Sequence, residues 1–79
     1  MFKNDEKTSA YIGCFVEKLR EFGFKLEEII IMLMNAADKT DLEKILKAID
    51  YIEPAGQGIV RKDVSKEDAE KTISQILKG

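Results

Sequence analysis

The sequence predicts an all-α fold, a compact bundle of four short helices with one Pro/Gly loop before the last helix. Apolar residues recur at helical spacing in several segments, and turn-forming residues are concentrated in residues 54–58. Residues 29–34 are six consecutive apolar residues, too many for one stripe of a helix, which indicates a segment apolar on more than one face. We therefore expect a single helical domain over residues 1–79, with residues 1–8 flexible and residues 53–64 forming a long loop.

The first helix is expected from Ser9 to Phe22. Thr8 or Ser9 is a suitable N-cap, because a side-chain hydroxyl can accept a bond from a free amide of the first turn. Gly23 can adopt the left-handed conformation that ends many helices, and Phe24 then contacts the last turn. The apolar residues at helical spacing are Ile12, Phe15, Val16, Leu19 and Phe22.

The second helix is expected from Leu26 to Ala36 or Ala37. Ile31 and Met34 fall outside its inward stripe and share a face with Glu27 and Asp38. They must be covered by the last helix, by the Ile59-Val60 segment or by another molecule. The expected inward residues are Leu26, Ile29, Ile30, Leu33 and Ala37.

The third helix is expected to begin with a capping box formed by Thr40 and Glu43. Glu53-Pro54 ends it, because the residue before a proline is displaced from the α region. Glu43 and Lys47 are spaced for an i, i+4 ion pair. The inward residues are Leu42, Ile45, Leu46, Ile49 and Ile52.

The fourth helix follows Ser65, an expected N-cap, and continues to the end of the chain. Its apolar side contains Ala69, Ile73, Ile76 and Leu77. Before it, Ile59 and Val60 are expected either to form a short extended segment or to close one end of the bundle. One core is predicted from all four helices, comprising Phe15, Leu19, Ile30, Leu33, Ile45, Leu46, Ile49 and Ile73.

Composition restricts the function classes. The 13 basic and 15 acidic residues are too evenly balanced to indicate nucleic acid or an anionic membrane. Cys14 is the only cysteine and histidine is absent, which excludes a disulfide within the chain and argues against zinc. No apolar run approaches the ~20 residues that span a bilayer, and the N-terminus lacks the apolar stretch of a signal peptide. We expect a cytoplasmic protein.

Residues that could carry catalysis are scarce. Gly56-Gln57-Gly58 resembles a phosphate-binding glycine loop, but it lacks the third glycine and the Lys-Ser/Thr pair. The carboxylates fall on predicted hydrated helix faces, and Cys14 has no histidine to act as its base. The sequence therefore predicts a protein that is not an enzyme, with no cofactor, no metal and no small-molecule substrate.

A nucleic-acid-binding transcriptional regulator is the first alternative. The second and third helices could form a helix-turn-helix, but the recognition helix would present Asp41 and Glu43 to a polyanion. The basic residues Arg61, Lys62 and Lys66 are interleaved with acids, as in a solvated face of mixed charge.

A second alternative is an accessory subunit of a larger enzyme or of a translation-related complex. Residues 60–70 resemble the approach to the last helix in the C-terminal domain of the ribosomal stalk protein that recruits translation GTPases. That family continues into a closing β-strand, whereas this chain stops after Lys78-Gly79. Helix capping selects the same residues, so we interpret the resemblance as convergence.

The favoured hypothesis is a small non-catalytic protein-interaction or regulatory domain that self-associates through its apolar second helix. The predicted partner-binding residues are Ile31, Met34, Glu27 and Asp38. A homodimer or another protein is the expected partner, and a membrane is not.

Overall fold

The computed structural model describes residues 6–56 and 58–79. These residues form a compact all-α bundle, as the sequence predicts, and no strand occurs among them. The helices are α1 (Glu6–Phe22), α2 (Leu26–Ala36), α3 (Leu42–Ile52), the 3-10 turn η1 (Pro54–Gly56) and α4 (Lys66–Lys78).

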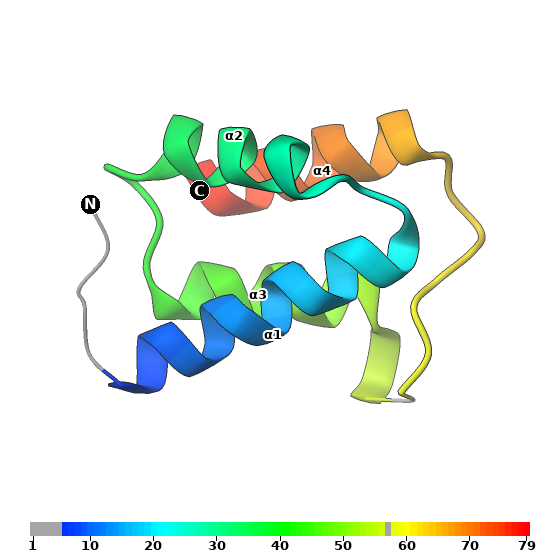
Figure 1. Cartoon of the computed structure of the whole chain (residues 1–79), viewed down its shortest axis with the longest axis horizontal. Coiled ribbons are helices and arrows are strands. Elements are labelled where there is room, and N and C mark those ends of the chain that lie inside the picture. Colours follow the sequence, from blue (N-terminus) through cyan, green and yellow to red (C-terminus); the bar gives the residue numbers. More distant parts are fainter. Residues whose placement is uncertain (1–5, 57) are drawn as a thin grey trace.

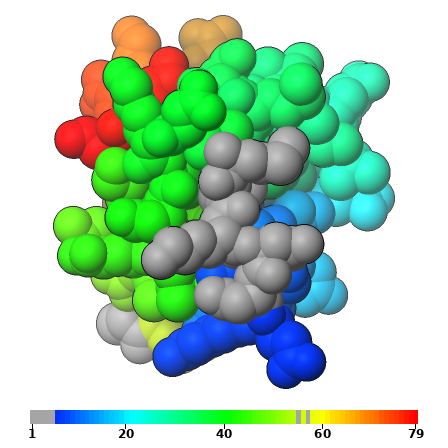
Figure 2. All heavy atoms as spheres, turned by 90° about the vertical axis from the view of Figure 1, so that its left-hand side faces the viewer, coloured from blue at the N-terminus to red at the C-terminus, as the bar shows by residue number. Residues whose placement is uncertain are grey.

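The four α-helices alternate in direction along the bundle, with α1 and α3 in one layer and α2 and α4 in the other (Figure 1). The main contacts join α1 to α2, α2 to α4, α4 to α3 and α3 to α1. Viewed along the bundle, α2 forms the upper right edge of the molecule, above α1 and beside α4 (Figure 2). The position of α2 at this corner leaves one of its sides facing outward.

The corner between α1 and α2 has the predicted glycine geometry. Gly23 has a φ of 127°, and its amide donates to the carbonyl oxygens of Leu19 and Arg20 at 3.1 Å. The Phe24 amide donates to the Leu19 carbonyl at 3.0 Å, and the Phe24 ring stacks on Phe22 with centroids 5.6 Å apart. These bonds satisfy the last carbonyls of α1 and direct the chain into α2.

Helix α1 begins at Glu6, three residues before the predicted start at Ser9. Glu6 to Thr8 are helical instead of flexible, and residues 1–5 lie outside the described residues. Thr8 is buried, and two helical turns separate it from buried Phe15 on the same side of α1. Packing against the bundle therefore extends the helix beyond the caps proposed from sequence.

The predicted capping box of α3 is also wrong, because Asp41 is the N-cap. Its carboxylate accepts a bond from the Lys44 amide at 3.0 Å. Thr40 is buried, and its hydroxyl donates to the carbonyl oxygen of Leu77. Thr40 therefore satisfies a carbonyl at the end of α4, which has no partner within its own helix.

The predicted ion pair between Lys47 and Glu43 on α3 is present, with Nζ and Oε1 3.7 Å apart.

The loop before α4 does not close the end of the bundle with an isoleucine. Ile59 is exposed and Val60 is half-buried. The Arg61 amide instead donates to the Ile52 carbonyl at 2.8 Å, which fixes the loop to the end of α3. Ser65 is the N-cap of α4 as predicted, and its hydroxyl accepts a bond from the Asp68 amide at 3.2 Å.

Removing this cap gives a testable change in stability. We expect Ser65→Ala to lower the free energy of unfolding by about 0.5–2 kcal/mol, since an amide of the first turn loses its partner. Ser65→Asp should be nearly neutral, because it keeps an acceptor and places negative charge at the positive end of the helix. Urea denaturation followed by circular dichroism measures both. Equal losses from the two variants would show that Ser65 does not act as a cap.

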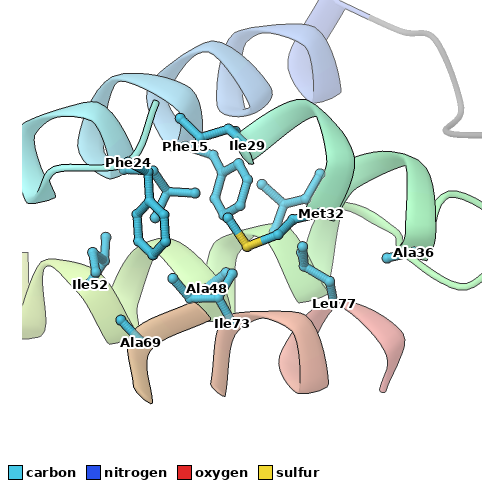
Figure 3. Close-up of a cluster of buried hydrophobic side chains, with 12 residues drawn as sticks. Phe15, Phe24, Ile29, Met32, Ala36, Ala48, Ile52, Ala69, Ile73 and Leu77 are labelled. Carbon is cyan, nitrogen blue, oxygen red and sulfur yellow. The ribbon is translucent and has the colours of Figure 1, made fainter. Parts of the chain in front are cut away.

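The core is formed by side chains that converge from all four helices and from Phe24 (Figure 3). Phe15, Leu19, Ile45 and Ile73 are buried as predicted, and Leu33 and Ile49 are partly buried against them. The other buried apolar residues are Phe24, Ile29, Met32, Ala36, Ala48, Ile52, Ala69 and Leu77.

Two members of the predicted core are exposed. The exposed fraction is 45% for Ile30 and 39% for Leu46. In α3 the buried positions are Ile45, Ala48 and Ile52, so the small side chain of Ala48 occupies the centre of the contact instead of Leu46. Close packing of α3 against both α1 and α4 favours a small residue at that position.

Candidate protein-interaction surface

Helix α2 has one side in the core and another that its own chain leaves exposed. The core side carries Ile29, Met32 and Ala36, all buried. The exposed side carries four large apolar residues, which we call the α2 apolar face: Leu26, Ile30, Ile31 and Met34. A contiguous exposed apolar patch on one helix is typical of a protein-interaction site.

The two apolar residues predicted for the site are the most exposed of these four. The exposed fraction is 57% for Ile31 and 71% for Met34. Glu27 and Asp38, the predicted polar members, are exposed as well. Glu27 precedes Ile31 by four positions and Asp38 follows Met34 by four, a spacing that places both acids on the same side of the helix as the apolar pair.

Leu26 and Ile30 are members of this face that sequence analysis assigned to the core. Leu26, Ile30 and Met34 follow one another at intervals of four residues, so they form a row along the helix. Ile31 lies beside this row. The predicted inward stripe is therefore wrong at Leu26 and Ile30, whereas Ile29 is buried and Leu33 is partly buried as predicted. The true stripe is rotated toward Met32 and Ala36, because α2 packs against α4 as well as against α1.

Contacts with α4 fix the rotation of α2 at its N-terminal end. The carboxylate of Glu28 accepts the Lys25 amide at 2.8 Å and lies 2.8 Å from the Lys66 ammonium group. The bond from Lys66, followed by that from the Lys25 amide, lowers the pKa of Glu28. The Lys66 ammonium also lies 5.6 Å from the centre of the Phe24 ring. The side of α2 that bears Glu28 therefore faces α4, and the α2 apolar face is directed away from it.

The C-terminal end of α2 is fixed by the turn that follows it. The amides of Lys39 and Thr40 donate to the Ala36 carbonyl at 2.9 Å, and the Thr40 hydroxyl bonds to Leu77 of α4. The Lys44 ammonium group bonds to the Lys39 carbonyl at 2.5 Å. Both ends of α2 are thus tied to the bundle, so the α2 apolar face is held in one orientation.

The Arg61 side chain holds the loop before α4 against the end of α3. Its guanidinium group forms two bonds with Asp63, at 2.8 and 2.9 Å, and one with the Tyr51 carbonyl at 3.1 Å. It also lies 4.4 Å from the centre of the Tyr51 ring. A shallow groove beside it, lined by Phe22, Val60 and Lys66 among others, separates the end of α1 from this loop.

The pair of Arg61 and Asp63 predicts a pH dependence of stability. The bond from Arg61 lowers the pKa of Asp63 from 3.8 to about 2. Between these two pKa values the folded state therefore binds fewer protons than the unfolded state. The stabilisation that the ion pair of Arg61 and Asp63 gives to the folded state is complete above about pH 4 and is lost as the pH falls through about 2. We expect Asp63→Asn to flatten the dependence of melting temperature on pH between these values. Asp50→Asn, at an exposed position of α3, is the control. Equal slopes in the parent and in Asp63→Asn would contradict the assignment.

Among the described residues, no three His, Cys, Asp or Glu side chains converge on a point where a metal ion would fit. Cys14 is half-buried on α1. Gly56 and Gly58 have φ values of 63° and 74°, so a turn accounts for both glycines. Gln57, between them, lies outside the described residues.

Comparisons of the chain with protein-family models, with curated proteins and with solved structures found no match. None of the helices described is both long enough and apolar enough to cross a membrane. The α2 apolar face and the charges around it are therefore the features of the domain that bear on its function.

Proposed function

We propose that the chain is a non-catalytic protein-interaction domain that binds another protein through the α2 apolar face. The observation that carries this proposal is the exposure of Leu26, Ile30, Ile31 and Met34 on one side of a helix whose other side is buried. Aliphatic and thioether side chains adapt readily to a partner surface. Covering them removes apolar area from water, which drives association.

The charges of the domain favour a protein partner over nucleic acid. Several cationic groups that could contact phosphate already contact a carboxylate: Arg61 with Asp63, Lys66 with Glu28, and Lys18 with Glu53 at 2.6 Å. Binding nucleic acid through these groups would require those ion pairs to be exchanged for phosphate contacts.

Affinity purification followed by mass spectrometry tests the proposal. The parent chain, the double variant Ile31→Glu/Met34→Glu and the control Ile59→Glu are used as baits in the native host. Ile59 is a matched control because it is exposed, at 64%, but lies in the loop before α4. We expect a specific protein to be retained by the parent and by the control and to be lost from the double variant. Retention of the same proteins by all three baits would contradict the proposal.

Self-association is measured separately by sedimentation equilibrium. The sequence predicts a homodimer, in which case the parent and Ile59→Glu dimerise and the double variant is monomeric. Partner binding with a monomeric parent would instead identify another protein as the occupant of the α2 apolar face.

A further inference from the structure

The chain has three methionines, and two of them lie on opposite sides of α2. Met34 belongs to the α2 apolar face and is 71% exposed, whereas Met32 is 4% exposed and its side chain points into the core (Figure 3). Met1 lies outside the described residues. Small solutes in water therefore reach the Met34 thioether directly, while they reach that of Met32 only when the domain opens.

Met34 lies among the other exposed apolar residues of α2. It follows Ile30 by four positions and Ile31 by three, which places the three side chains next to one another on the helix surface. Among the described residues, it has the largest exposed fraction of any large apolar side chain. A partner that covers the α2 apolar face must therefore also cover the Met34 sulfur, so the chemical state of that sulfur affects binding.

We propose that Met34 is an oxidation site, at which a peroxide converts the thioether to a sulfoxide and thereby weakens binding through the α2 apolar face. This inference rests on the proposed function and adds a means of regulation to it. The sulfur attacks one oxygen of hydrogen peroxide, and the O–O bond breaks as the S–O bond forms. The departing hydroxide takes the proton of the transferred oxygen and leaves as water. Sulfur loses two electrons and the peroxide gains them.

Oxidation at Met34 changes the exposed face and leaves the fold intact. A sulfoxide is polar, and at position 34 it stays hydrated in the unbound domain. A partner that covers it removes that water, which costs enough free energy to weaken binding by about tenfold. The same reaction at Met32 would place a polar group in the core, where it would destabilise the domain.

Selective oxidation is tested by treating the folded parent with hydrogen peroxide and locating the added oxygen by mass spectrometry. Trypsin releases both methionines in one peptide, residues 26–39, and fragment ions that break the chain at Leu33 distinguish them. We expect Met34 to be oxidised about tenfold faster than Met32, or more, in the folded domain and at a similar rate in denaturing urea. The melting temperature should stay close to that of untreated protein. Equal rates in the folded domain, or unfolding on oxidation of Met34 alone, would overturn the inference.

Loss of binding is tested with Met34→Leu, which keeps an apolar side chain of similar volume and has no sulfur to oxidise. The immobilised parent and variant are treated with peroxide, which catalase then removes, and are exposed to extract of the native host. We expect both untreated baits to retain the same protein, the treated parent to retain about tenfold less of it, and treated Met34→Leu to retain it in full. Both baits contain Cys14, so an equal loss from the two would assign the effect to another group and overturn the inference.

The two proposals fail in different ways. If the parent oxidised at Met34 still retains a protein that Ile31→Glu/Met34→Glu loses, the α2 apolar face is an interaction surface and only the oxidation inference is wrong. If untreated Ile31→Glu/Met34→Glu retains the same proteins as the untreated parent, the proposed function is wrong, and the oxidation inference is wrong with it.

Discussion

Replacing Phe15 by alanine is expected to abolish most of the stability of the domain. The Phe15 side chain is fully buried where α1 faces the other helices (Figure 3). Truncating a buried phenylalanine costs about 3–5 kcal/mol, from lost transfer free energy and from the cavity that remains. The single core of so small a domain provides a net free energy of unfolding of only about 3–5 kcal/mol. We therefore expect the variant to lose its cooperative thermal transition, measured by circular dichroism.

Phe22→Ala is the matched control for this prediction. Phe22 is half-buried at the end of α1, where its ring stacks on Phe24. Its truncation should lower the melting temperature while leaving a cooperative transition, because solvent can fill part of the vacated space. If Phe15→Ala melted within a few degrees of the parent, the assignment of Phe15 to the centre of the core would be wrong.

Most helix boundaries could be predicted from local sequence. Gly23 ends α1, Pro54 follows the end of α3, and Ser65 begins α4, as expected. Each of these depends on the backbone preference or hydrogen bonding of a residue and its immediate neighbours. Tertiary context is not needed to recognise such signals.

The roles of Thr8 and Thr40 could not be predicted in the same way. Both residues are common N-caps, and sequence analysis assigned them to that role. In the structure Thr8 is buried within α1, and Thr40 bonds to Leu77, 37 residues further along the chain. A local pattern contains no information on contacts at that separation.

The rotation of α2 is the principal feature that sequence periodicity leaves undetermined. With six consecutive apolar residues, an inward stripe that includes Leu26 and Ile30 and one that includes Met32 and Ala36 are equally consistent with the pattern. The structure selects Met32, since α2 lies beside both α1 and α4. For the candidate site, Ile31 and Met34 were predicted from sequence because they lie outside both stripes, whereas Leu26 and Ile30 were missed.

Substituting glutamate at Met32 or at Met34 should give opposite results, although the two residues are separated by one position. Met32 is 4% exposed and Met34 is 71% exposed. A carboxylate at position 32 would be buried among apolar groups without a partner, which costs several kcal/mol and should unfold the domain. At position 34 it would be hydrated, so helicity and melting temperature should remain close to those of the parent.

Thermal unfolding by circular dichroism compares these two variants. Leu26→Glu and Ile30→Glu extend the test to the residues that sequence analysis placed in the core, and both are expected to fold. Unfolding of Met34→Glu, or a stable Met32→Glu, would show that α2 is rotated differently and that the α2 apolar face is not the exposed side.

Methyl NMR during titration with the protein that the parent bait retains tests most directly whether a partner covers the outer side of α2. Ile29, Ile30 and Ile31 are consecutive, yet only Ile29 is buried in the core. We predict that the methyl resonances of Ile30, Ile31 and Met34 shift most as this protein is added, while those of Ile45 and Ile59 change little. Shifts centred on Ile59, on the groove beside Arg61 or on α3, with Ile31 and Met34 unaffected, would contradict the account.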